Sequence, residues 1–264
     1  MKKYIVLSVN RNVDYMYFMP ITIWSWRKAG FEPICIYVGE LCEVSELIFE
    51  SVDKVYKFSS IEGIRDSTIS QVARLYASSF PSLHENDYII LGDCDMLALG
   101  DHWNPDLGTV TVYNHDLTGY GEIPMCYVGA PVHLWRSVLN LNSNNWNYLI
   151  KRDLENYNNA KSDDFYTYWG CDQQILTQRL NEYGKERITF INRGQYSSGF
   201  ARGRVDRGNW SLDHEVFIDA HLEQQTWQNP AKVERLYALL AKVWPNEDFT
   251  WFKEYTEEFK KLAV

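Results

Sequence analysis

Two aspartates separated by a single residue follow an apolar run in the stretch DYIILGDCDMLALGD, residues 87–101. If strand alternation continues through this stretch, Asp93 and Asp95 lie on one side of the chain and Cys94 on the other. Two carboxylates held so close repel each other unless a cation lies between them and a ligand. Oxygen donors at this spacing suit Mg²⁺ or Mn²⁺, which bind through one or two carboxylates plus substrate phosphates. The pair therefore predicts a metal site for a phosphorylated ligand.

A purely structural role is the alternative, because such a pair also occurs in turns where one aspartate caps the next segment. The neighbouring residues favour the metal site. The run DYIIL precedes the pair and MLAL follows it, whereas a solvated turn needs no apolar residues on both sides. In open parallel sheets, ligands also bind beyond the carboxyl ends of the strands, where this pair is expected to lie.

The elements that must position this pair alternate between strand and helix. Short apolar runs predict strands at 2–10, 32–39, 52–58, 87–91, 108–114, 187–192 and 215–222. Helical spacing predicts helices at 19–31, in the second half of 61–80, within 165–184 and at 229–244, and residues 125–139 predict a strand that turns into a helix. This order implies right-handed crossovers and a mostly parallel sheet flanked by helices. The Asn-rich residues 140–164 predict a surface insertion with one short helix, and 193–210 predict a loop.

Composition narrows the class of protein. The chain has 264 residues, 45% of them hydrophobic and 23% charged, which suits one large α/β domain with a modest C-terminal appendage. A net charge of −9 argues against nucleic acid as the main partner. Five scattered cysteines without a CxxC pair predict neither a disulfide framework nor a zinc site, and they fit a reducing cytoplasm. No stretch reaches the length of a transmembrane helix, and the 15% aromatic content favours a carbohydrate or nucleotide ligand.

The run QVARLYASSFPSLHENDYIILGDCDMLALGD, residues 71–101, resembles the central signature of glycosyltransferases with the GT-A fold, most closely the family 8 type. The resemblance implies an α/β, Rossmann-like nucleotide-diphospho-sugar transferase fold with C-terminal helices. It also implies that the aspartate pair holds Mn²⁺, or Mg²⁺, against the diphosphate of a nucleotide sugar, usually a UDP-sugar. By position, Asp95 is then the principal metal ligand, Asp93 contacts both metal and ribose, and Arg74 reaches the donor.

The resemblance extends to both sides of this run. In the first strand and its loop, YIVLSVNRNVDY, it implies that Val9, Asn10 and Tyr15 cradle the uracil, although a plain surface loop is the alternative. The motif WGCDQQIL resembles an Asp-Gln motif near the reacting sugar carbon, which gives Asp172 and Gln173. From the residues alone, an acidic side chain there equally suits the first turn of a helix, whose dipole it stabilises.

A third metal ligand in the family is a histidine near the end of a late strand. His214 and His221 both qualify, and we prefer His221 because the predicted strand EVFIDAHL leads directly into it. The family continues with His-x-x-Gly-x-x-Lys, whereas this chain reads HLEQQTW and lacks the lysine. Arg202 and Arg204, in the glycine-rich loop SSGFARGRVDRG, are candidates to replace it at the diphosphate, and a solvated basic loop is the alternative.

We therefore expect residues 1–225 to form a GT-A catalytic domain and residues 226–264 a helical appendage packed on it. The predicted activity is metal-dependent transfer of a sugar from a nucleotide-diphosphate donor to a glycan or other hydroxyl acceptor, with retention of configuration. Inversion, with Asp172 as base, stays open. A sugar-phosphate nucleotidyltransferase is disfavoured because SVNRNVDY has no glycine-rich phosphate loop. A non-catalytic glycan-binding protein predicts a damaged metal site. Peripheral membrane contact through the C-terminal helices is disfavoured by their balanced Lys and Glu content.

Overall fold

The computed structural model describes residues 1–100, 102–115, 122–161, 170–193 and 203–263, apart from the side chains of 156–161. Its main sheet has seven strands in the order β3-β2-β1-β4-β7-β6-β8. Neighbours pair in parallel except where β7 meets β4 and β6, so the sheet is mostly parallel, as predicted. These strands are β1 (Lys3–Val9), β2 (Glu32–Val38), β3 (Lys54–Phe58), β4 (Tyr88–Leu91), β6 (Val110–Val112), β7 (Val128–Pro131) and β8 (Ile188–Phe190).

A second, three-stranded sheet has the order β5-β10-β9. Its strands are β5 (Met96–Ala98), β9 (Arg204–Asp206) and β10 (Asp219–His221). The sequence predicts a longer last strand at 215–222 and only a loop at 193–210, so both predictions are corrected here. The pairing of β10 with β5 matters for the site, because β5 directly follows the aspartate pair and β10 ends on His221. This small sheet therefore brings a late segment of the chain to an early one.

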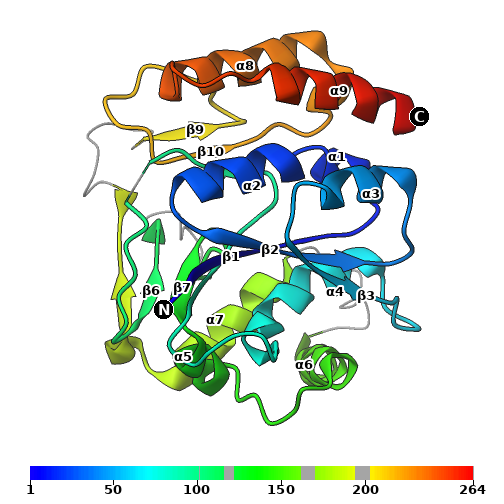
Figure 1. Ribbon diagram of the computed structural model, residues 1–264. Coiled ribbons are helices and arrows are strands. Elements are labelled where there is room, and N and C mark those ends of the chain that lie inside the picture. Colours follow the sequence, from blue (N-terminus) through cyan, green and yellow to red (C-terminus); the bar gives the residue numbers. More distant parts are fainter. Residues whose placement is uncertain (101, 116–121, 162–169, 194–202, 264) are drawn as a thin grey trace.

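Helices cover both faces of the main sheet (Figure 1). On one face lie α1 (Val13–Met16), α2 (Met19–Lys28) and α3 (Glu43–Phe49), with α8 (Pro230–Val243) and α9 (Thr250–Leu262) stacked beyond them. The opposite face carries α4 (Asp66–Ala73), α5 (Val132–Val138), α6 (Trp146–Lys161) and α7 (Cys171–Tyr183), together with the 3-10 helix η1 (Arg74–Ser79). Short 3-10 helices η4 (Lys185–Arg187) and η6 (Thr226–Gln228) follow α7 and β10.

Alternation along β1 divides the interior into two cores. Ile5 and Leu7 pack with α2, α8 and α9, whereas Tyr4 and Val6 pack with α4 to α7. A strand buried on both faces in this way reads as a continuous apolar run, which is why its position is predictable from the sequence.

Local signals set several helix ends. Asn229 caps α8 by accepting hydrogen bonds from the N–H groups of Ala231 and Lys232, at 3.0 and 3.4 Å, and Pro230 occupies its first turn. Helix α6 is longer than the short helix predicted within 140–164. Asn145 accepts a hydrogen bond from the Tyr148 N–H at 3.2 Å at its start, and an apolar side of buried leucine and isoleucine anchors it beneath the polar surface.

The C-terminal helices pack against the first helices of the chain. Tyr17 lies 5.3 Å from Phe259, between ring centroids, and Trp24 lies 4.8 Å from Trp244. Such contacts are expected of an appendage that packs on the catalytic domain. The division of the chain into a domain of residues 1–225 and an appendage of residues 226–264 remains our prediction. None of the helices in the described part of the chain has an apolar stretch long enough to cross a bilayer.

Candidate active site

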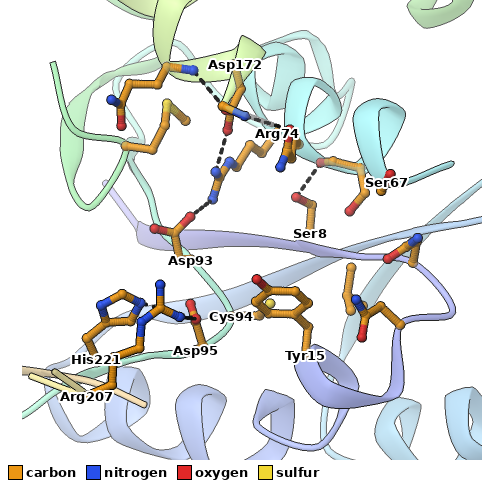
Figure 2. Close-up of a pocket in the computed structure, with 18 residues that line it drawn as sticks. Ser8, Tyr15, Ser67, Arg74, Asp93, Cys94, Asp95, Asp172, Arg207 and His221 are labelled. Carbon is orange, nitrogen blue, oxygen red and sulfur yellow. Dashed lines mark hydrogen bonds and ion pairs between the residues drawn. The ribbon is translucent and has the colours of Figure 1, made fainter. Parts of the chain in front are cut away.

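A pocket lies beyond the carboxyl ends of β1 and β4, between α4, α7 and the small sheet, as the crevice rule for open α/β sheets predicts. Nine of the eleven residues predicted to form the site line this pocket (Figure 2). They come from six separate segments of the chain: Val9, Asn10, Tyr15, Arg74, Asp93, Asp95, Asp172, Gln173 and His221.

The aspartate pair occupies a turn between β4 and β5 and is not extended strand. The Met96 N–H donates to the Asp93 carbonyl at 3.2 Å and closes this turn. The prediction that strand alternation aligns the two carboxylates is therefore wrong. Asp93 faces Arg74, whereas Asp95 faces His221 and Arg207, so each carboxylate has a cationic partner of its own (Figure 2).

Arg74 is shared between two carboxylates. Its guanidinium forms ion pairs with Asp93 and Asp172 and also donates to the Gly92 carbonyl at 2.6 Å. Burial acts to raise the pKa of Asp93, but Arg74 outweighs it and holds that pKa below its usual value. For Asp172, burial prevails and raises the pKa of the carboxyl. One buried cation thus fixes two carboxylates that arrive from different sides of the pocket.

Asp172 and Gln173 begin α7, after Gly170, whose φ of 87° suits a residue without a side chain. The Gln173 N–H donates to Asp172 Oδ1 at 2.8 Å, so both oxygens of this carboxylate accept hydrogen bonds. The Gln173 side chain donates to Glu122 Oε2 at 2.8 Å. The first turn of α7 is therefore held in a fixed position at the edge of the pocket.

His221 lies between two carboxylates. Its Nε2 is 3.4 Å from Asp95 Oδ2, and its Nδ1 is 3.6 Å from Asp206 Oδ2. Burial acts to lower the pKa of His221, but the two carboxylates outweigh it and raise that pKa to about 9. The rival candidate, His214, packs its ring against Phe217 and does not line the pocket. The structure therefore brings His221, and not His214, to the aspartate pair.

Asp95 and His221 present an oxygen and a nitrogen donor to the same part of the pocket. No group of three His, Cys, Asp or Glu side chains among the described residues is already arranged as a metal cluster, because Asp93 is turned toward Arg74. Two such donors fit a divalent cation that takes its remaining ligands from phosphate and water. Asp93 joins them only if its ion pair with Arg74 opens.

The first loop forms the opposite wall. Tyr15 stands on α1, where Asn12 caps the helix by accepting from the Asp14 N–H at 3.0 Å. Its hydroxyl accepts a hydrogen bond from Gln224 Nε2 at 2.6 Å, so the segment after β10 supports this wall. Burial raises the pKa of Tyr15, which is therefore a neutral hydrogen-bonding group at physiological pH.

The two predicted loop arginines do not reach the pocket in the described structure. Arg202 lies outside the described residues. Arg204 is buried in β9, where it pairs with Asp219 and donates to Cys126 Sγ at 3.7 Å. Asn114 completes this group through a 2.9 Å hydrogen bond to Asp219. Arg204 thus holds the small sheet together, and its predicted contact with the diphosphate is not supported by this placement.

Other residues line the pocket that no motif predicts. Arg207 follows β9, whereas Ser70 and Gln71 project from α4, one turn before Arg74. The Ser8 hydroxyl donates to the Ser70 carbonyl at 2.5 Å and joins β1 to α4. Helical spacing from Arg74 could have indicated Gln71 and Ser70, because residues three and four apart share a face. Arg207 has no comparable signal, since its position depends on the pairing of β9 with β10.

Comparison with known proteins extends this picture at the level of the fold. No family model and no curated protein sequence matches the chain. Among solved structures, the glycosyltransferase GlyE of Streptococcus pneumoniae TIGR4 matches with a TM-score of 0.51 and 11% identity over 100% of this chain and 66% of that one. The chain therefore spans just under two thirds of the GlyE chain. The galactosyltransferase LgtC, solved with donor and acceptor sugar analogues, matches with a TM-score of 0.51 and 15% identity over 98% of this chain and 94% of that one.

These similarities, together with the order of the main sheet, confirm the predicted fold class. The chain has the mixed α/β fold of GT-A glycosyltransferases, with its pocket at the carboxyl edge of the sheet.

Proposed function

We propose that this chain is a glycosyltransferase that moves a sugar from a nucleotide-diphosphate donor, a UDP-sugar, to a hydroxyl group of a glycan or other acceptor. The observation that carries the proposal is the convergence of nine separately predicted residues on one pocket at the carboxyl edge of the sheet. A motif that matched by chance would not bring segments as distant along the chain as β1 and β10 to one place. The donor and acceptor sugar analogues of LgtC support the same class of substrate.

Each part of the pocket suits one part of such a donor. Val9, Asn10 and Tyr15 form a wall of backbone, amide and aromatic groups for the uracil. Asp93 would accept from the ribose hydroxyls. Asp95 and His221 would hold Mn²⁺ or Mg²⁺, which when bound neutralises charge on the diphosphate. The pocket thus separates a neutral region for the base from a charged region for the diphosphate.

In the reaction, the bond between the anomeric carbon and the diphosphate oxygen breaks, and its electron pair remains on the diphosphate. The acceptor hydroxyl forms the new bond to that carbon, and its proton passes to the departing diphosphate oxygen, which has gained the electron pair. Asp172 is poorly suited to take this proton directly, because both of its oxygens already accept hydrogen bonds from Arg74 and the Gln173 N–H. This arrangement supports retention over inversion with Asp172 as base. We assign to the Gln173 side chain the contact with the transferred sugar.

The test is turnover of a panel of UDP- and GDP-sugars with Mn²⁺, comparing the wild type with Asp95→Ala. We expect the variant to lose activity by about a hundredfold or more, because a charge that stabilises the leaving diphosphate is worth several kcal/mol. Asp53→Ala, which removes an exposed aspartate that pairs with Arg27, is the matched control and should retain activity. If no nucleotide sugar is bound or turned over, or if Asp95→Ala matches the wild type, the proposal is wrong. The anomeric configuration of the product, read by NMR, decides between retention and inversion.

A further inference from the structure

The carboxylates of the pocket already engage its buried cation. Asp93, Asp95 and Asp172 line it, and the buried Arg74 is already committed to two of them. A diphosphate brings further negative charge to the same place, so it requires a positive group that is only weakly engaged. Arg74 cannot turn to the ligand without leaving the buried Asp172 and the partly exposed Asp93 unpaired, which is costly.

Arg207 meets this requirement. It lines the pocket, and its side chain is 40% exposed. Its ion pair in the described part of the chain is with Asp95 Oδ2, at 3.7 Å, which is beyond hydrogen-bonding distance. Figure 2 shows Arg207 beside His221 and next to Asp95. The guanidinium is therefore directed into the charged region by a weak contact that an anionic ligand can replace.

The backbone holds this arginine in place. Arg207 follows β9 in a turn where the Asn209 N–H donates to the Asp206 carbonyl and the Gly208 N–H donates to Asp206 Oδ1, both at 2.9 Å. Asp206 itself lies opposite His221 in the β9–β10 ladder. The turn that carries Arg207 is thus tied to the residue that would bind the metal.

We propose that Arg207 is a binding residue for the diphosphate of the donor, an assignment that rests on the proposed function. Without ligand, the guanidinium forms its long ion pair with Asp95. A divalent cation bound at Asp95 would compete for that carboxylate and leave Arg207 free to contact the phosphate oxygens. There it forms charge-assisted hydrogen bonds that strengthen as the leaving group gains charge. Arg207, and not Arg204, then supplies the positive charge that the segment after His221 lacks.

The experiment measures binding of UDP, UMP and uridine by calorimetry with Mg²⁺, for the wild type, Arg207→Ala and Arg207→Lys. We expect Arg207→Ala to weaken UDP binding by about tenfold or more and to leave uridine binding within about twofold of the wild type. Arg207→Lys keeps the charge and should recover part of the loss for UDP. Arg27→Ala is the matched control. It removes an exposed arginine that pairs with Asp53 and does not line the pocket, so this variant should bind all three ligands normally.

Two results overturn the assignment while leaving the proposed function intact. In one, Arg207→Ala binds UDP as tightly as the wild type. In the other, it loses uridine and UDP binding equally, so that Arg207 only shapes the pocket. A wild type that binds none of the three ligands overturns the proposed function and this assignment with it. Unfolding curves of the variants show whether a loss of binding comes from loss of the fold.

Discussion

Two arginine–carboxylate networks meet on η1 and have opposite balances of charge. On the pocket side, the single guanidinium of Arg74 serves Asp93 and Asp172. Two residues further along, the Tyr76 hydroxyl donates to Asp153 at 2.7 Å. On that side one carboxylate receives two guanidinium groups.

The second network is saturated with donors. Arg152 approaches both oxygens of Asp153, at 2.8 and 2.9 Å, and Arg179 donates to it at 2.6 Å. The Asp153 side chain is 2% exposed, and its pKa is lowered because these hydrogen bonds outweigh the effect of burial. Arg179 also pairs with the exposed Glu182 at 3.2 Å. Such a network joins α6 and α7 to η1 and has no capacity left for a ligand.

The difference indicates which network is structural and which is functional. An excess of donors around one carboxylate stabilises the folded chain and leaves nothing to bind. An excess of carboxylate around one cation leaves negative charge that a metal ion can satisfy. The three predictions below test this distinction, from the largest expected effect to the smallest.

Removal of one cation should affect the two networks unequally. Arg74→Ala leaves the buried Asp172 and the partly exposed Asp93 without their shared cation, so we expect it to lower the free energy of unfolding by about 3–5 kcal/mol at neutral pH. Arg152→Ala leaves Asp153 with Arg179 and Tyr76 and should cost about 1–2 kcal/mol. Urea unfolding at pH 7.5 measures both. Without Arg74 the carboxylates have raised pKa values, so the deficit of Arg74→Ala should shrink as the pH falls to 5. Equal losses in the two variants would contradict the comparison.

Removal of one carboxylate should reverse the order. Asp153→Asn removes the carboxylate that Arg152 and Arg179 share and leaves Arg179 with the exposed Glu182, and we expect a loss of about 2–4 kcal/mol. Asp172→Asn leaves Arg74 paired with Asp93 and should cost no more than about 1 kcal/mol. Because the pKa of Asp153 is lowered in the folded state, its contribution is present above the unfolded pKa of about 4 and is lost as the pH falls through the folded value. The gap between wild type and Asp153→Asn should therefore close in acid. If Asp172→Asn is less stable than Asp153→Asn, the assignment of the Asp153 network as structural and the Arg74 network as functional is wrong.

The smallest effect concerns the titratable cation of the pocket. Asp206→Asn removes one of the two carboxylates beside His221, and we expect the pKa of His221 to fall from about 9 by about one unit. NMR titration of the histidine ring in the metal-free protein measures this value, and His221→Gln identifies the signal. Because that pKa is raised in the folded state, the stabilisation it gives is present below about pH 6.5 and is lost as the pH rises through 9. An unchanged pKa would show that Asp206 does not act on His221.

The strands of the main sheet, the aspartate pair and half of the pocket residues are predictable from the sequence, because each depends on a local signal. The apolar runs of β1, β2 and β4 are buried on both faces and stand out against polar loops. Arg74, Asp93 and Asp172 belong to short motifs whose residue types and spacing can be seen directly in the sequence. The full length of α6 is not predicted, because its few apolar anchoring residues stand among many polar ones.

Only the tertiary structure decided how these residues pair. The sequence by itself determined an α/β fold with a carboxylate pair at a strand end, but strand alternation wrongly aligned Asp93 with Asp95. Their different partners arrive from η1 and β10, which are distant along the chain. The strand before it already favours His221 over His214, but the positions of Arg207 at the pocket and Arg204 within the small sheet depend likewise on the pairing of β9 and β10. Long-range pairing follows from the packing of the whole chain, and no local spacing encodes it.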